Sequence, residues 1–490
     1  MKLTVPTNFN FYCEHPILDK DIDNGKVSAK INKQVYTPLK IEGRSTNNFK
    51  KLFDTTFELT AKHETLKQLK VFRFKPMRNQ LDEEKQLILK LFKRQNPKND
   101  YIEYFVQTGL FAGVVYHNGC EFNIECAYGN KVLHRMLNFL NNIYIDTKET
   151  QAEKHIKANV FQQILSYLFI HSLERSANLG LPKAYQQKQQ HDYKMRGSID
   201  MNAFLKRDIP FLGKISSHYR EQQEIQPIID VLYLTCEKLR KNLGLDSIKP
   251  VMNIYQQLKS QYSKNYVLPV TIQNAKKHTA LSNPIFAQFR QTLEYAEIIL
   301  NDWDLQTKKN SKLQTFGYLF DMSQLFEVYL EKLLAKNLPD WTVSSQEKIA
   351  VYPNRFYQRN MYPDIVLHHL TSDKVIVLDA KFKKMRLDKQ YHDLDVRDFY
   401  QIHTYMQYYG AKLLFGGLIY PLSEVHNSEF SHSNSLFDHS QAEFDSPFFI
   451  VDGIEVKEFN DESFDIMSSE RAFVERLKNL IQYKTKPSLL

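Results

Sequence analysis

The sequence predicts a multidomain α+β protein, and three features of the chain support this fold class. With 490 residues the chain exceeds the usual length of one domain. Apolar residues alternate in residues 1–150, helical spacing prevails in residues 151–305, and short apolar runs return in residues 306–490. We therefore expect a strand-rich N-terminal domain, a mostly helical middle region and a C-terminal domain over these three ranges.

The N-terminal domain contains a clear hairpin pattern. In the stretch GLFAGVVYHNGCEFNIECAYG, which begins at Gly109, apolar residues alternate on both sides of Asn118-Gly119. This dipeptide favours the positive φ angles of a type I′ turn, so we expect two antiparallel strands around it.

The middle region shows helical apolar spacing together with the end signals of helices. Proline is typical of a first helical turn, and glycine is typical of the residue that follows a helix. The expected helices run from near Val160 to before Gly180, from Pro227 to Gly244, and from a cap at Ser282-Asn283-Pro284 to about Leu300.

The net charge favours an anionic partner. Lys and Arg number 65 against 56 Asp and Glu, which gives a net charge of +9 and a pI near 8.9. Such a balance fits DNA binding. The longest apolar run, LLFGGLIYPL from Leu413, is far shorter than the roughly 20 residues of a membrane span. We expect a cytoplasmic protein that does not enter the membrane.

The cysteines and glycines exclude several classes of site. Cys13, Cys120, Cys126 and Cys236 are scattered without a CxxC pair, so we expect reduced, mostly buried thiols and no zinc or iron–sulfur centre. Neither GxxxxGK[ST] nor GxGxxG occurs, so the chain itself is expected to bind no nucleotide, and any motor would be a partner.

The segment VIVLDAKFK, residues 375–383, predicts a strand with one chemically active face. Side chains alternate along a strand. Asp379 and Lys381 therefore share one face, while Ala380 and Phe382 point to the other.

A second strand upstream supplies another carboxylate. MYPDIVLHHL places Asp364 beside Pro363, which cannot donate a ladder hydrogen bond and so lies at a strand end. The short turn LTSDK predicts antiparallel pairing that brings Asp364 towards Asp379. Two such carboxylates suit Mg²⁺ or Mn²⁺, and Lys381 would position or deprotonate the attacking water and neutralise charge on a phosphate. The alternative is a surface ion pair of Asp379 and Lys381 at an exposed strand end.

Residues 315–338 predict one long amphipathic helix, with Glu327 inside its apolar arc. A carboxylate in that position needs a partner, and a metal ion would be one. The alternative is a glutamate at the edge of the stripe that reaches solvent. The apolar side consists of Phe316, Leu319, Phe320, Phe326, Leu330 and Leu334.

Four further segments each leave two interpretations open. Gln401 and Tyr405 lie four apart on an expected helix and either line the site or form a solvated face. MRGSID at 195–200 is a glycine turn or a phosphate contact, and KKMRLDK at 383–389 follows the DNA backbone or is a solvated charge run. The polar loop at 424–446 holds three histidines, which either bind metal or are simply solvated.

The order Pro-Asp, fourteen residues, Asp-Ala-Lys resembles the PD-(D/E)xK nuclease superfamily. The resemblance implies a restriction-endonuclease-like α/β domain with a central mixed sheet. It also implies that the backbone carbonyl of Ala380 is a metal ligand and that Gln401 orients a water or the phosphate. The implied catalytic residues are Asp364, Asp379, Lys381, Gln401 and Glu327, and the implied metal ligands are Asp364, Asp379, Ala380 and Glu327.

The C-terminal motifs resemble one family more closely, the McrC subunit of McrBC-type modification-dependent restriction systems. The resemblance implies an anti-phage DNA endonuclease subunit that docks through its N-terminal part on a hexameric, McrB-like AAA+ GTPase and stimulates it. A non-catalytic activator of the ring and an autonomous endonuclease are the alternatives. The segments that carry the resemblance are 320–334, 362–367, 375–383, 400–412 with LIYP at 418, and, more loosely, 195–200.

Overall fold

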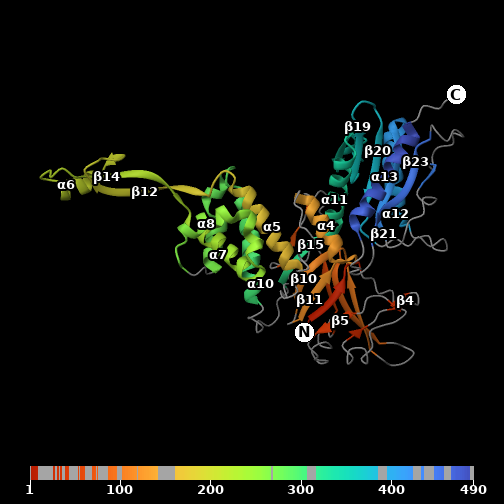
Figure 1. Ribbon diagram of the computed structural model, residues 1–490, viewed down its shortest axis with the longest axis horizontal. Coiled ribbons are helices and arrows are strands. Elements are labelled where there is room, and N and C mark those ends of the chain that lie inside the picture. Colours follow the sequence, from red (N-terminus) through yellow and green to blue (C-terminus); the bar gives the residue numbers. More distant parts are fainter. Residues whose placement is uncertain are drawn as a thin grey trace. The chain divides into compact units, whose positions relative to one another are not determined.

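The computed structural model divides into two compact units, residues 1–149 with 310–490, and residues 150–309 (Figure 1). The predicted middle region, 151–305, falls within the second unit, whereas the predicted N-terminal and C-terminal segments share the first. The residues that the structure describes are 2–8, 26–27, 30–31, 34–35, 39–42, 53, 56–60, 69–72, 74, 87–95, 102–117, 120–141, 160–265, 269–305, 316–383, 394–422, 432–434, 446–456 and 465–485.

The N-terminal part of the first unit forms a seven-stranded sheet in the order β2-β5-β1-β11-β10-β15-β7. β10 and β11 pair antiparallel, with His117 opposite Cys120, so the predicted hairpin is confirmed. Its Asn118-Gly119 turn lies outside the described residues. The strands are β1 (Lys2–Pro6), β2 (Lys26–Val27), β5 (Leu39–Glu42), β7 (Leu69–Phe72), β10 (Phe111–His117), β11 (Cys120–Glu125) and β15 (Phe316–Asp321).

Strand β15 shows that the prediction of a single helix over residues 315–338 was wrong in its first turns. β15 pairs with β10, and helix α11 (Met322–Asn337) begins only after it. Gly317 lies so close to β10 that an added Cβ would meet a backbone oxygen of that strand at 2.1 Å. The Asp321 carboxylate caps the first turn of α11 by accepting backbone hydrogen bonds. The close-packed glycine and the cap set the boundary, because the apolar residues alone fit either element.

Helix α4 (Gly129–Asn141) joins the N-terminal segment to the C-terminal helices of the same unit. Arg135 of α4 donates hydrogen bonds of 2.7 and 2.6 Å to the carboxylate of Glu470 in α13 (Ile466–Thr485). The Tyr329 hydroxyl of α11 donates to the same carboxylate at 2.7 Å. Charge-assisted bonds of this kind hold sequence-distant segments together. Two smaller sheets complete this part: β6 (Phe57–Thr60), β8 (Leu87–Gln95) and β9 (Ile102–Thr108), and β3 (Lys30–Ile31) with β4 (Gln34–Val35).

The C-terminal part of the first unit forms a six-stranded mixed sheet in the order β16-β19-β20-β21-β23-β22. β20, β21 and β23 run parallel, and the remaining pairs are antiparallel. All residues of β20 and β21 are buried, since α12 (Val396–Tyr409) packs on both strands and α11 packs on β20. The strands are β16 (Trp341–Ser345), β19 (Ile365–His369), β20 (Val375–Ala380), β21 (Leu413–Leu422), β22 (His432–Asn434) and β23 (Phe448–Glu455), with a short 3₁₀ turn η4 (Gly410–Lys412) before β21.

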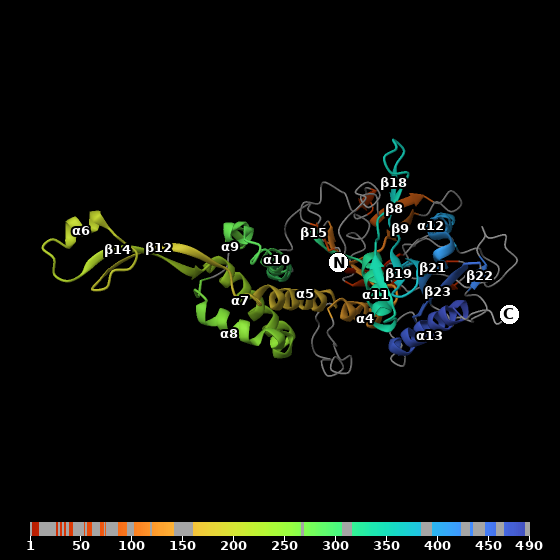
Figure 2. The ribbon, with the colours of Figure 1, turned by 90° about the horizontal axis from the view of Figure 1, so that it is seen from above.

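Between β16 and β19 the chain forms a separate two-stranded hairpin, β17 (Ile349–Val351) with β18 (Arg359–Met361). Figure 2 shows this hairpin extending beyond the mixed sheet. Ile349 and Met361 at its base pack in the core beneath α12, whereas residues 352–360 are exposed. The hairpin is therefore anchored at its base and exposed to solvent at its tip.

The second unit consists mainly of helices, as predicted. The helices expected at Val160 and Pro227 are confirmed as α5 and α7, but the helix expected from Ser282 begins at Phe289 instead. Residues 284–288 form turns, with the Asn283 side chain accepting from the backbone of Ile285 at 3.1 Å. The elements are α5 (Val160–Ala177), α7 (Gln226–Leu243), η2 (Leu245–Val251), α8 (Met252–Gln261), α9 (Pro269–Lys277), η3 (Thr279–Ser282) and α10 (Phe289–Leu305).

The second unit also contains a long ribbon that the apolar pattern did not predict. β12 (Lys183–Asp192) and β14 (Ile215–Glu224) pair along their full length, and β13 (Ser198–Ile199) and α6 (Met201–Arg207) lie towards its far end (Figure 1). The sequence of β12, KAYQQKQQHD, is polar on both faces. Such a strand lacks the apolar alternation on which strand prediction depends.

Two expectations about composition can be compared with the structure. Cys120, Cys126 and Cys236 are buried free thiols, as expected, and Cys13 lies outside the described residues. Among the described helices, none combines the length and the apolar character that crossing a membrane requires.

Candidate active site

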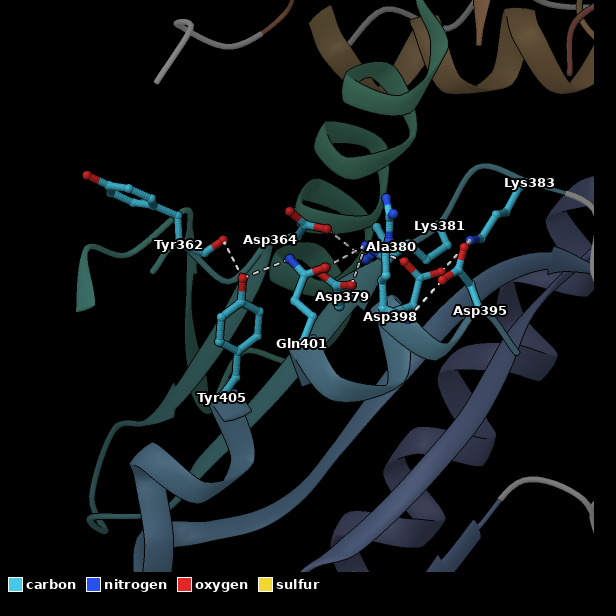
Figure 3. Close-up of polar contacts among 11 residues, drawn as sticks. Tyr362, Asp364, Asp379, Ala380, Lys381, Lys383, Asp395, Asp398, Gln401 and Tyr405 are labelled. Carbon is cyan, nitrogen blue, oxygen red and sulfur yellow. Dashed lines mark hydrogen bonds and ion pairs between the residues drawn. The ribbon is translucent and has the colours of Figure 1, made fainter. Parts of the chain in front are cut away.

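The pairing of β19 with β20 brings the two predicted aspartates together. The strands run antiparallel with Ile365 opposite Leu378, so Asp364 and Asp379, one residue beyond this pair on each strand, face each other. The Asp364 Oδ2 accepts a hydrogen bond of 3.0 Å from the backbone N–H of Ala380. The predicted antiparallel pairing is confirmed, and Figure 3 shows both carboxylates at one end of the sheet.

Asp379 is a fully buried carboxylate in the middle of an apolar strand. Its exposed fraction is 0%, and among the described residues the close polar partner of its oxygens is the Lys381 ammonium. Burial, reinforced by the nearby Asp364, raises the pKa of Asp379 well above its ordinary value. The charged form is therefore unfavourable unless a cation compensates it.

Lys381 is the cation that faces Asp379. Its Nζ lies 2.6 Å from Asp379 Oδ2 and 3.6 Å from Asp398 Oδ1. Burial alone would lower the pKa of Lys381, but the charges of Asp379 and Asp364 outweigh burial and raise that pKa above its ordinary value. The ammonium thus keeps its proton at neutral pH, which suits positioning and charge neutralisation rather than proton removal.

Lys381 begins a hydrogen-bonded chain that returns to the strand of Asp364. Its Nζ donates to Gln401 Oε1 at 3.3 Å, and Gln401 Nε2 donates to the Tyr405 hydroxyl oxygen at 2.9 Å. The Tyr405 hydroxyl in turn donates to the backbone carbonyl of Tyr362 at 3.4 Å. Both α12 residues therefore lie in the site, and their functional role remains a prediction.

Asp398 is a site residue that sequence reasoning missed. It lies one turn before Gln401 on α12, and its carboxylate forms ion pairs with both Lys381 and Lys383. Lys383 also lies 3.5 Å from Asp395, whose side chain caps α12 by accepting from the backbone of Arg397. The three-residue spacing between Asp398 and Gln401 was the available signal, because residues so spaced share a helix face.

Phe382 holds the end of the strand that carries Asp379 and Lys381 in place. Its ring is 2% exposed and contacts Phe326 of α11 and Tyr128 at centroid distances of 5.5 and 5.2 Å. As predicted from the alternation along the strand, this side chain packs while Asp379 and Lys381 face the site. The apolar anchor restricts the orientation of Lys381.

Glu327 occupies α11 and is 9% exposed. In the part of the chain that the structure describes, no group of three or more His, Cys, Asp or Glu side chains is close enough to hold a metal ion. Glu327 is therefore not gathered with Asp364 and Asp379 in this arrangement, and its role as a ligand remains a prediction.

The two aspartates alone still fit a divalent ion. Mg²⁺ commonly uses one or two carboxylates and takes its remaining ligands from water and substrate phosphate. Asp379 is fully buried beside a second carboxylate, Asp364, and Lys381 is the ammonium paired with it. A divalent ion would neutralise the negative charge that remains at the two aspartates. Asp364, Asp379 and the carbonyl of Ala380 are the groups that would hold it.

The remaining sequence motifs belong to the second unit or lie mostly outside the described residues. Gly197 of MRGSID adopts a φ of 73°, which confirms the glycine turn, and Arg196 lies over the ring of Tyr219 at 5.6 Å. Residues 384–389 of the basic run are not described, and neither is most of the loop at 424–446. Its His432 lies in strand β22.

Comparison with known proteins identifies the family. A family profile described as McrBC 5-methylcytosine restriction system component matches residues 83–421, more than half of the chain. The chain belongs to this family. The matched range contains every site residue described above, from Glu327 to Tyr405.

One solved structure that contains bound McrC shares the fold. A chain of the refined half-complex from a tetradecameric assembly of Thermococcus gammatolerans McrB AAA+ hexamers with bound McrC is 15% identical, with a TM-score of 0.52 over 98% of this chain and 100% of that one. A chain of the T. gammatolerans McrBC complex is 14% identical, with a TM-score of 0.30 over 69% and 88% of the two chains. The comparison with curated proteins found no match.

Proposed function

We propose that this McrBC-family protein is the DNA endonuclease subunit of a restriction system that defends against phage, and that it cleaves phosphodiester bonds with Mg²⁺ or Mn²⁺. The C-terminal mixed sheet would then be a PD-(D/E)xK nuclease domain. The observation that carries the proposal is the buried carboxylate of Asp379, opposite Asp364 and beside Lys381. A purely structural ion pair of Asp379 with Lys381 would not need Asp364 beside it, because Asp364 raises the pKa of Asp379 and so disfavours its charged form.

The residues of the chain would divide the work of hydrolysis. When bound, Mg²⁺ supplies Lewis-acid activation and charge neutralisation at the phosphate. The ammonium of Lys381 stabilises negative charge that develops on the phosphate, because it stays protonated and lies within the site. The Gln401 amide, held by Lys381 and Tyr405, would orient the attacking water.

The proposed partner is a McrB-like AAA+ GTPase hexamer. The T. gammatolerans structure that shares the fold contains McrB AAA+ hexamers with bound McrC. By this likeness the present chain would dock on such a ring and stimulate its GTP hydrolysis, and the absence of a phosphate-binding glycine motif fits this division of labour.

A cleavage assay with the D379A variant tests the proposal. The wild-type chain with the partner ring, GTP and Mg²⁺ should cut modified DNA, and D379A should not cut it while still stimulating GTP hydrolysis. Cleavage that survives D379A would support the non-catalytic activator. Cleavage by the wild-type chain with Mg²⁺ and DNA alone would instead support an autonomous endonuclease.

A further inference from the structure

The β17–β18 hairpin precedes Asp364 of the candidate active site in the chain, and its tip carries exposed aromatic rings and arginines. We propose that this tip binds the DNA that flanks the cleaved phosphate, with its aromatic rings stacked on bases. The inference rests on the proposed function, because it takes DNA as the ligand of the neighbouring site.

The aromatic residues at the tip are gathered and open to solvent. Phe356 is 99% exposed, Tyr352 is 61% exposed and Tyr357 is 46% exposed. Tyr357 packs edge-on against Tyr352 and Phe356, with centroid distances of 5.3 and 4.8 Å. Exposed apolar groups concentrated on one projection indicate a binding surface.

The charge of the hairpin selects an anionic ligand. Residues 348–362 contain Lys348, Arg355 and Arg359 and no acidic residue. The preceding Glu347 pairs with His368 at 2.7 Å, so its charge is directed to the sheet. Aromatic rings that stack on bases, combined with arginines that contact phosphates, are the usual elements of nucleic-acid binding without strict sequence preference.

The short chain segment between the hairpin tip and Asp364 limits how far from the cleaved phosphate the tip can contact DNA. Met361 at the hairpin base packs in the core, and only Tyr362 and Pro363 separate it from Asp364. Phe356 lies eight residues before Asp364, so at about 3.3 Å per residue it reaches at most about 26 Å from that carboxylate. At about 3.4 Å per base pair this distance corresponds to seven or eight base pairs. The tip would therefore contact DNA within one helical turn of the cut.

A DNA-binding measurement that does not depend on cleavage tests this inference. Full-length D379N protein, with and without the added F356A substitution, is titrated against a fluorescent DNA duplex that carries an unpaired single-stranded end, so that bases are available for stacking. Because loss of one stacked base weakens binding about 5- to 150-fold, F356A should raise the Kd by at least about fivefold. Phe356 is almost fully exposed, so its truncation removes little packing. Replacing Arg355 and Arg359 with Gln should reduce the slope of log K against log salt by up to about two.

The L370A variant is the matched control. Leu370 is an apolar residue that is 64% exposed. It follows the last residue of β19, whereas Asp364 precedes the first, so the two lie at opposite ends of that strand. L370A should bind DNA like the parent. Equal Kd values for F356A, L370A and the parent would overturn the inference, and so would a loss of affinity for the AAA+ ring with DNA binding intact. If the wild-type chain never cuts DNA but F356A still weakens DNA binding, the proposed function is refuted and the inference about the hairpin tip stands.

Discussion

Replacing Asp379 with Asn should abolish cleavage and yet stabilise the metal-free protein. Asp379 is fully buried, and burial together with Asp364 raises the pKa of Asp379, so its charge opposes folding at neutral pH. At a pH above the folded pKa, each unit by which folding raises this pKa lowers the free energy of unfolding by about 1.4 kcal/mol. Lys381 keeps Gln401 and Asp398 as neighbours after the substitution. We expect D379N to increase the free energy of unfolding by about 1–3 kcal/mol.

The pH dependence of this gain has a defined sign. Below the unfolded pKa of about 3.9 the carboxyl is protonated in both states, so D379N should bring no advantage. Between that value and the raised folded pKa of Asp379, the native wild type binds more protons than the unfolded chain, and its stability falls as pH rises. Above the folded pKa the difference between D379N and the wild type should be complete.

Urea unfolding in EDTA measures the stability gain of D379N without metal, and urea unfolding in Mg²⁺ measures the stabilisation by the ion. Mg²⁺ at about 100 times its Kd should stabilise the wild type by about 2.7 kcal/mol and leave D379N unchanged. The control is D452N, because Asp452 is also buried but accepts a hydrogen bond of 2.8 Å from Arg476 in an ion pair. D452N should lose about 3–5 kcal/mol with or without Mg²⁺, since it breaks a mostly buried pair. If D379N is destabilised in EDTA as D452N is, Asp379 is a structural partner of Lys381 and the reasoning fails.

Three further outcomes are expected. The K381M variant should lower the single-turnover cleavage rate by at least about 100-fold with little change in the Kd for DNA, because its ammonium acts on charge that develops during the reaction. The E327Q variant should raise the Mg²⁺ concentration for half-maximal cleavage by about 10-fold, whereas an unchanged Mg²⁺ titration would assign Glu327 to the fold alone. Cys126 and Cys236 should resist a chromogenic thiol reagent at pH 7 until the protein is unfolded, because burial raises the pKa of each thiol to about 12.

Local patterns predicted the candidate site well because strand alternation and a short turn determine it. Once β19 and β20 pair antiparallel, the period of two places Asp379 and Lys381 on one face and Phe382 on the other. The four-residue spacing of Gln401 and Tyr405 places both on one face of α12, and this face lies against Lys381. Asp398 shares a helix face with Gln401 by its three-residue spacing, but assigning it to the site also required knowledge of which face of α12 meets the sheet.

Long-range pairing explains what the sequence did not predict. The residues of β15 were assigned to a helix because their apolar positions also fit the helical period, and their partner β10 lies about two hundred positions earlier in the chain. The ribbon β12–β14 was missed for another reason, since its strands bury few side chains and pair through their backbones. Patterns of burial cannot reveal an element that is hardly buried.

The location of Asp379 explains how one strand can carry an unfavourable charge and still fold. β20 lies between β19 and β21, and its other residues are apolar and buried, so the sheet holds the strand in register whatever the state of the aspartate. A carboxylate on a mobile loop would turn to water and lose its raised pKa. On this central strand it cannot do so, and the unfavourable interaction with Asp364 persists beside the Lys381 ammonium. If the proposed nuclease function holds, the rigidity of the sheet would convert this electrostatic repulsion into affinity for a divalent ion.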